Sequence, residues 1–158
     1  MPVSKQEFRH ALGQFASAVT IVTAKTASGD LRGITVTAFS SLSLDPPLVL
    51  ICIDKRARLH DELAVGRHFC VNILAEEQEP LSNTFASKAE DRFAGVEHRP
   101  GVHGSPHLAG AVAHLECTIV ERLAGGDHTI IVGQVESTVV DETKAPLLYG
   151  RGKYQRLK

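Results

Sequence analysis

Residues 31–53 read LRGITVTAFSSLSLDPPLVLICI, and this stretch decides the class of fold. Apolar and hydroxyl side chains alternate in its first part, which is typical of a strand with one apolar face. An Asp-Pro-Pro sequence at residues 45–47 then breaks the pattern. Leu48–Ile53 follows as a continuous apolar run, which we expect to be a strand covered on both faces. The stretch therefore predicts two strands, Leu31–Phe39 and Leu48–Ile53.

More strands flank this stretch, and most of them follow one another as hairpins. Ala18–Ala24 is rich in β-branched residues and leads through a turn at residues 27–30 into the strand just described. His68–Leu74 is a further strand. Ala113–Arg122 and Thr129–Val140 are joined across a Gly-Gly pair that suits a tight turn. Sequential hairpins of this kind predict a small, largely antiparallel barrel.

Short helices are predicted outside the strands. A capping box at residues 4–7 begins an amphipathic helix that ends near Gly13. Arg58–Val65 and Glu76–Lys88 also have helical patterns, whereas Arg92–Gly110 is rich in Gly, Pro and His and is expected to be a long loop. The prediction is a mainly β protein with short helices packed outside a barrel.

Composition limits the class of protein further. A chain of 158 residues suits one domain, residues 1–158, and the apolar share of 43% excludes a disordered chain. The net charge of -1 gives no basic bias for a nucleic acid or an anionic membrane, so neither partner is expected. Three scattered cysteines form no disulfide framework, and we find no signal peptide or membrane anchor. These features favour a cytoplasmic protein.

Several common site motifs are absent. No G-x-G-x-x-G follows a strand, and neither H-E-x-x-H nor G-x-S-x-G occurs. His103 and His107 are four residues apart, but Gly104 and Pro106 prevent a regular helix that would present both. No third ligand stands at a recognisable spacing, so we predict no metal site.

Two polar stretches each have a functional and a structural interpretation. A row of hydroxyl groups runs through Thr35, Thr37, Ser40 and Ser41. The row is either a set of neutral donors for a flat polar ring and its phosphate arm, or an exposed strand face. A basic cluster, Lys55-Arg56-Ala57-Arg58, follows the Leu48–Ile53 strand and is either a phosphate clamp or a solvated charge run.

A third feature is a histidine where a turn enters an apolar strand, in Gly126-Asp127-His128-Thr129. Side-chain alternation would place Asp127 and His128 on opposite faces, so we do not expect Asp127 to be the side-chain partner of His128. Asp127 is expected instead to fix the turn through its own backbone contacts. Taken alone, His128 has the pattern of an exposed turn residue.

The order and spacing of these stretches resemble the short-chain flavin reductases, which are reductase components of two-component aromatic monooxygenases. The phenol hydroxylase and 4-hydroxyphenylacetate hydroxylase reductases are the most similar members. The matching segments cover nearly the whole chain: residues 8–16, 19–23, 33–50 and 69–74, Gly126-Asp127-His128-Thr129 with Gly133, and residues 146–149 running into 152–154.

The resemblance implies a split β-barrel of the FMN-binding, flavin-reductase-like type, typically a homodimer with the flavin near the subunit interface. It implies that NADH or NADPH reduces FMN or FAD by hydride transfer, and that reduced flavin passes to an oxygenase component. The segment Ala57-Arg58-Leu59 replaces a Ser-x-Thr that many members carry, which favours FAD over FMN.

The resemblance also implies site residues. His128 matches the histidine beside the nicotinamide and is the predicted catalytic residue. The residues predicted to bind the cofactor are Thr35, Thr37, Ala38, Ser40, Ser41, Asp54, Lys55, Arg58, Phe85, Ala86, Asp127, Tyr149 and Tyr154.

Three alternatives stay open at this point. The first is a flavin-binding carrier without catalysis, which would use the hydroxyl stretch but not His128. The second is a flavin-dependent reductase of another acceptor, such as a corrin or a ferric chelate. The third is a small structural β-barrel in a larger assembly.

Overall fold

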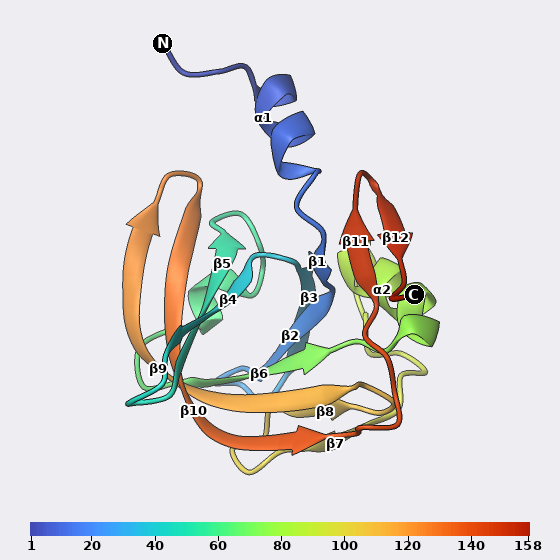
Figure 1. Ribbon diagram of the computed structural model, residues 1–158. Helices are drawn as coiled ribbons and strands as arrows, with labels where there is room; N and C mark the ends of the chain where they lie inside the picture. The colour runs from blue at the N-terminus through green and yellow to red at the C-terminus, as the bar shows by residue number, and fades with distance from the viewer.

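The computed structural model describes residues 1–158 and shows a mainly β protein with a few short helices (Figure 1). The helices are α1 (Lys5–Leu12), η1 (His60–Glu62), η2 (Glu76–Gln78) and α2 (Glu79–Ala86), where η denotes a 3-10 helix. The strands are β1 (Ser17–Ala18), β2 (Thr20–Lys25), β3 (Leu31–Val36), β4 (Phe39–Ser43), β5 (Leu48–Asp54), β6 (His68–Ile73), β7 (His98–Pro100), β8 (Pro106–Leu108), β9 (Ala113–Gly125), β10 (His128–Val140), β11 (Leu148–Gly150) and β12 (Lys153–Gln155). The mainly β class with short helices is confirmed, whereas the edge strands β3 and β4 do not pair to close the main sheet into a barrel.

Seven strands form one antiparallel sheet in the order β3-β2-β6-β9-β10-β5-β4. Its two edges, β3 and β4, are consecutive in the chain and are joined by Thr37 and Ala38. The N–H of Cys52 in β5 donates to the carbonyl of Ala38 at 3.0 Å, so the link is attached to the β4–β5 side of the sheet. Two smaller sheets, β1-β11-β12 and β7-β8, complete the fold.

The interior contains two apolar clusters. The larger one is built from the main sheet and includes Val22, Ile51, Phe69 and Ile131, all fully buried. The smaller one lies beneath α2 and the terminal strands, and its members are Val19, Ile21, Leu74, Phe85, Leu108 and Leu147. Both faces of β2 are buried, because Val22 and Ala24 belong to the larger cluster and Ile21 belongs to the smaller one.

Strand β5 differs from the expectation of burial on both faces. Val49, Ile51 and Ile53 are buried, whereas the alternate residues are only half-buried. The reason is the position of β5 next to the edge strand β4, where a single apolar face meets the core. The second face of β5 is therefore open to the surface that carries the polar site residues.

Both predicted helices that flank the sheet are confirmed. In α1, the Ser4 side chain accepts from the Glu7 N–H at 3.2 Å, and Glu7 accepts from the Ser4 N–H at 2.9 Å. The helix nevertheless projects away from the body of the molecule, and the apolar side chains of Phe8 and Leu12 are exposed (Figure 1). Helix α2 lies against the sheet and buries Phe85.

The helix predicted over Arg58–Val65 is wrong, since only the three residues of η1 are helical. Arg122 on β9 explains the difference, because its guanidinium donates to the carbonyls of His60 and Leu63. In a longer helix, those carbonyls would instead accept hydrogen bonds from N–H groups of the following turn. Gly66, with φ of +89°, then turns the chain into β6.

Other boundaries also differ from the prediction. The strand predicted over Leu31–Phe39 ends at Val36, and the hydroxyl-rich residues form part of a separate strand, β4. The predicted loop over Arg92–Gly110 contains the hairpin of β7 and β8, whose β8 residues are all buried. The residues after Leu147 form the β11–β12 hairpin, which was not expected. These strands are only three to five residues long, and short strands carry little alternation to detect.

The hairpin of β9 and β10 is confirmed and is longer than predicted, because β9 extends to Gly125 and β10 begins at His128. Gly126 has φ of +68°, as the tight turn requires. No helix in the structure is both long and apolar enough to cross a bilayer.

Gly133→Ala should destabilise the protein. Gly133 lies on β10, and a methyl group there would be 2.6 Å from Cζ of Phe69 and 2.8 Å from Cβ of Cys117. Overpacking of a filled core of this kind lowers the free energy of unfolding by about 1–3 kcal/mol. Urea unfolding followed by circular dichroism would measure this change. Gly125→Ala on the same hairpin is the control, since its nearest contact would be an ordinary 3.5 Å; equal stabilities of the two variants would contradict the packing argument.

Candidate functional site

The hydroxyl-rich stretch does not form one uniform row. Thr35 on β3 donates its hydroxyl to the carbonyl of Ser82 in α2 at 2.6 Å, so this hydroxyl already has a partner. Thr37 and Ala38 are exposed in the link between β3 and β4. Ser40 and Ser41 are exposed on β4, and the Ser40 hydroxyl donates to the Ser41 carbonyl at 2.8 Å. Four of the five residues therefore lie on open surface, and Thr35 attaches α2 to the sheet.

The end of β5 carries the predicted charged residues. Asp54 receives two hydrogen bonds from the Arg56 guanidinium, at 3.2 and 2.9 Å, and one from the Arg56 N–H at 2.8 Å. These bonds hold the pKa of Asp54 below its usual range. Arg56 is thus neutralised by a carboxylate, whereas Lys55 and Arg58 form no ion pair. Within the basic cluster, Lys55 and Arg58 are the cations available to a ligand.

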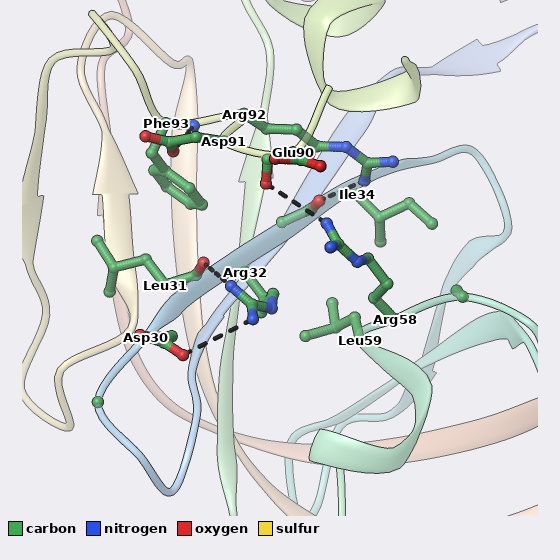
Figure 2. A pocket seen from close by; sticks show the side chains of 13 residues that line it. Asp30, Leu31, Arg32, Ile34, Arg58, Leu59, Glu90, Asp91, Arg92 and Phe93 are labelled. Atoms are coloured by element: carbon green, nitrogen blue, oxygen red, sulfur yellow. Dashed lines mark hydrogen bonds and ion pairs between the residues drawn. The ribbon is translucent and has the colours of Figure 1, made fainter. Parts of the chain in front are cut away.

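Arg58 lines a surface cleft of about 500 Å³, which we call the Arg58 cleft. Its walls are residues 29–34 from the β2–β3 turn and β3, residues 57–59 after β5, and residues 90–93. Figure 2 shows Arg58 reaching toward the segment of Glu90 and Arg92, while Arg32 turns toward Asp30. Three guanidinium groups and three carboxylates, those of Asp30, Glu90 and Asp91, therefore border one cleft, and a guanidinium group is the chemistry that binds a phosphate.

Arg92 fixes the outer wall of the Arg58 cleft. Its guanidinium donates to the carbonyl of Gly33 at 2.7 Å and twice to the carbonyl of Ser87, at 3.1 and 2.6 Å. Burial, followed by the nearby Arg58, lowers the pKa of this guanidinium. A cation placed beside a second cation in this way favours an anion between them. Sequence reasoning missed Arg92, which lies in a segment assigned to an irregular loop.

His128 begins β10, and its Cα is paired with that of Asp54 across the β5–β10 ladder. Contrary to the expectation from alternation, Asp127 is its partner: Nδ1 of His128 and Oδ1 of Asp127 are 2.7 Å apart. Alternation fails because Asp127 belongs to the turn and not to the strand. The hydrogen bond to His128 lowers the pKa of Asp127. The carbonyl of Asp127 also accepts from the Lys55 N–H at 3.0 Å, as the predicted backbone role requires.

Strand pairing brings several of these residues to one end of the sheet. Ala38 is bonded to Cys52, and Cys52 pairs with Ile130. Two residues further along the same strands, Asp54 pairs with His128. The β3–β4 link, the end of β5 and the start of β10 therefore form one continuous rim. His128 has 40% of its side chain exposed on this rim.

The remaining predicted residues surround α2. Phe85 is fully buried and lies against Gly33, where a Cβ would be 2.6 Å from its ring, so only the main chain of this segment can reach a ligand. Ala86 is exposed at the end of the helix.

The two tyrosines lie on the terminal strands. The hydroxyl of Tyr154 donates to Oδ1 of Asn83 at 2.8 Å and lies 2.8 Å from the Ser82 hydroxyl. Tyr149 packs edge-on against Tyr154 with ring centroids 5.4 Å apart, and it is exposed. Tyr154 thus holds α2, whereas Tyr149 presents an open ring. Tyr154 also packs against the apolar cluster that contains Phe85.

The histidines of the predicted loop have structural partners. His103 stacks on His68, and His107 lies 3.3 Å from the buried Glu116. No group of three or more His, Cys, Asp or Glu side chains in the chain is arranged to hold a metal ion.

Comparison with known proteins shows which family this chain belongs to. The family model described as "Flavin reductase like domain" matches residues 12–158. The chain is 41% identical to the "Flavin-dependent monooxygenase, reductase subunit HsaB" of Mycobacterium tuberculosis, over 96% of this chain and 82% of that protein. It is also 41% identical to an "NADH-dependent flavin reductase" of Rhodococcus sp, over 99% and 88% of the two chains. It spans only 47% of a Rhizobium meliloti protein described as "Probable flavin reductase", with 42% identity.

Solved structures give the same result. The NADH:FAD oxidoreductase SgcE6 of Streptomyces globisporus, solved in complex with NAD and FAD fragments, superposes with a TM-score of 0.92 and 37% identity. The match covers 100% of this chain and 97% of that one. The flavin reductase PheA2 superposes with a TM-score of 0.86 and 34% identity, over 99% of each chain. With a family model and relatives that cover nearly its full length, this chain belongs to the flavin reductase family.

Proposed function

We propose that this flavin reductase transfers hydride from a reduced nicotinamide dinucleotide to FMN or FAD and then releases reduced flavin to an oxygenase component. The observation that carries the proposal is the rim on which the β3–β4 link, Asp54 with Lys55, and His128 meet. Relatives named as reductase components of monooxygenases support the oxygenase partner. The relative named as NADH-dependent supports NADH as the donor.

The rim suits a flat, polar ring. Exposed hydroxyls on Thr37 and Ser41 are neutral donors that can bond the polar edge of a flavin, and the Ser40 hydroxyl, which donates to the Ser41 carbonyl, is left as an acceptor. Backbone N–H groups and hydroxyls placed along such an edge stabilise negative charge that develops there during reduction. The bound cofactors supply the hydride and its acceptor, so the protein's task is to hold the two rings at reacting distance.

His128 is proposed to orient the nicotinamide. The Asp127 carboxylate accepts the Nδ1 proton at 2.7 Å, which fixes the tautomer and leaves Nε2 directed away from the turn. Nε2 has no partner within the chain, so it can accept a hydrogen bond from the nicotinamide amide. Asp127 thus acts through His128 as a positioning residue.

The Arg58 cleft is proposed to hold the phosphate arm of the flavin. Ala57 and Leu59 line the cleft without a hydroxyl, so the guanidinium of Arg58 has to supply the charged hydrogen bonds there. Arg92 has fewer donors left, since three of its N–H groups already donate to the carbonyls of Gly33 and Ser87. The missing hydroxyls favour FAD over FMN, and the charged contact to the phosphate arm rests on Arg58, because Arg32 is paired with Asp30.

Three further features are part of the proposal. The split β-barrel is supported by the two sheet edges, β3 and β4, which are consecutive in the chain and held by the Ala38–Cys52 bond. The homodimer is supported by exposed apolar side chains, namely Phe8 and Leu12 on α1, Phe15 after it, Leu42 on β4 and Leu44 in the β4–β5 turn. The cytoplasmic location is supported by three cysteines that are all free thiols.

The purified chain should oxidise NADH only when flavin is added. Absorbance of NADH is followed with riboflavin, FMN and FAD in turn, and NADPH is compared under the same conditions. We expect turnover with FAD or FMN and faster turnover with NADH than with NADPH. Flavin binding without any NADH oxidation would show a carrier instead of an enzyme.

His128→Ala should raise the KM for NADH or lower kcat by about tenfold, since a group that positions a substrate contributes to transition-state binding. Asp127→Asn should have the same effect as His128→Ala, a higher KM for NADH or a lower kcat, but by a smaller factor. Flavin affinity, measured by fluorescence quenching, should stay unchanged in both variants. His98→Ala is the control, since His98 is also an exposed histidine but lies on β7. Wild-type kinetics for His128→Ala would remove the proposed role.

Arg58→Gln should weaken FAD binding by about tenfold, because a hydrogen bond to a charged group contributes roughly 1.5–3 kcal/mol. The loss should be larger at low salt, where charges are less screened. Lys55→Gln should have a smaller effect in the same direction. Arg156→Gln, an exposed arginine near the C-terminus, is the matched control. Equal dissociation constants for Arg58→Gln and Arg156→Gln would contradict the phosphate role of the cleft.

A further inference from the structure

A second, smaller cleft of about 220 Å³ lies at the C-terminal end of β2, and we call it the His68 cleft. Its walls are the end of β2, the start of β6 and the turn between β7 and β8. The lining residues are Lys25, Thr26, Gly66, Arg67, His68, His103 and Ser105. The β2–β3 turn contributes residues to this cleft and to the Arg58 cleft, but the two clefts share no residue.

The charged side chains that line the His68 cleft are all basic. Lys25, Arg67, His68 and His103 face it, and none of them forms an ion pair within the chain. The Arg67 guanidinium donates through Nη2 to the carbonyl of Lys25 at 2.9 Å, which fixes its position and leaves its other donors free. No carboxylate lines this cleft, so the basic groups in its lining repel one another, and a bound anion would remove this repulsion.

The two imidazole rings are tightly stacked. The ring centroids of His68 and His103 are 3.9 Å apart, and the planes differ by 6°. Nδ1 of His68 is bonded to the Thr118 hydroxyl at 3.2 Å, so only Nε2 is left for a ligand. Burial, followed by the positive charges of His103 and Arg67, lowers the pKa of His68, while Glu136 and Glu116 act in the opposite direction without forming an ion pair.

A buried hydroxyl without a partner supplies an independent observation. Ser105 is 2% exposed, and its hydroxyl has no hydrogen-bond partner although it belongs to the wall of the cleft. Buried polar side chains are nearly always bonded, so an orphaned hydroxyl at a basic cleft indicates a missing acceptor. The other hydroxyl of the cleft, on Thr26, is already bonded to Ser28 and Asp30.

We propose that the His68 cleft binds a phosphate group through Arg67, Lys25, the His68–His103 pair and the hydroxyl of Ser105. A phosphate dianion offers several acceptor oxygens to donors that approach from different sides. The cleft is too small for a whole cofactor, since pockets for drug-sized ligands have about 300–1,000 Å³. The group is either free inorganic phosphate or a phosphate monoester carried by a nucleotide, and this site is separate from the proposed flavin site.

The test uses the histidine ring signals in carbon–proton NMR spectra of the flavin-free protein. Sodium phosphate is titrated at pH 7 and constant ionic strength, with sodium chloride as the parallel series. We expect the His68 and His103 signals to shift and to saturate at millimolar phosphate, while the other histidines and the chloride series stay unchanged. Shifts that rise linearly without saturation, or that affect all eight histidines equally, would overturn the proposal.

Variants separate this cleft from the flavin site. Arg67→Gln should raise the phosphate dissociation constant by about tenfold, as expected for the loss of a charged hydrogen bond. Ser105→Ala should raise it a few-fold and should not lower the melting temperature, because the hydroxyl has no partner to lose. Arg58→Gln should leave the His68 shifts intact. Loss of these shifts in Arg58→Gln but not in Arg67→Gln would place the phosphate in the Arg58 cleft and overturn the inference.

Dinucleotides distinguish the two sources of phosphate. NADP⁺ carries a 2′-phosphate monoester that NAD⁺ lacks. If NADP⁺ shifts the His68 signal at lower concentration than inorganic phosphate and NAD⁺ does not shift it, the ligand of the cleft is the phosphate of a nucleotide. If only inorganic phosphate shifts it, the ligand is the free anion. Absence of any shift with both compounds would leave the cleft without a phosphate site and refute the inference, whether or not the protein oxidises NADH.

Discussion

The register between β5 and β10 is the constraint on which the rest of the site depends. Seven consecutive pairs, from His128 opposite Asp54 to Gln134 opposite Leu48, hold these strands together. A slip of one residue would turn every side chain of β10 to the other face, including His128. The register is fixed because the buried residues of both strands, Ile51 and Ile131 among them, belong to the same apolar cluster. The core therefore determines which polar groups stand on the rim.

The long elements of the fold could be predicted from the sequence, because their patterns are set by local residues. The hairpin of β9 and β10 has a turn that needs glycine, and α1 has a complete capping box. The short elements depend on distant partners that no local pattern shows. Strand β8 is held by Asn72 of β6, whose Oδ1 accepts from the N–H of Leu108, and η1 stays short because Arg122 binds its carbonyls.

The candidate site was predicted in part. The resemblance located His128, Lys55 and Arg58, and the structure places the first two on one rim and Arg58 in the cleft beside β3. The pairing of Asp127 with His128 was missed because alternation applies to strands and not to turn residues. Arg92 was missed for a different reason. Its role follows from bonds to the carbonyl of Gly33, which is distant in sequence, and to that of Ser87, which lies just after α2 outside any regular element.

Helix α1 also has a consequence for how the chain behaves in solution. Eight residues are too few for a helix to persist in water by itself, and this one buries none of its side chains within the chain. One backbone bond, from Arg151 to Gly13, and one side-chain bond, from Arg151 to Gln14, tie its end to the terminal hairpin. The ordered form of the N-terminal segment therefore rests on its capping box and these two bonds, so it should fray and be cleaved by proteases more readily than the sheet.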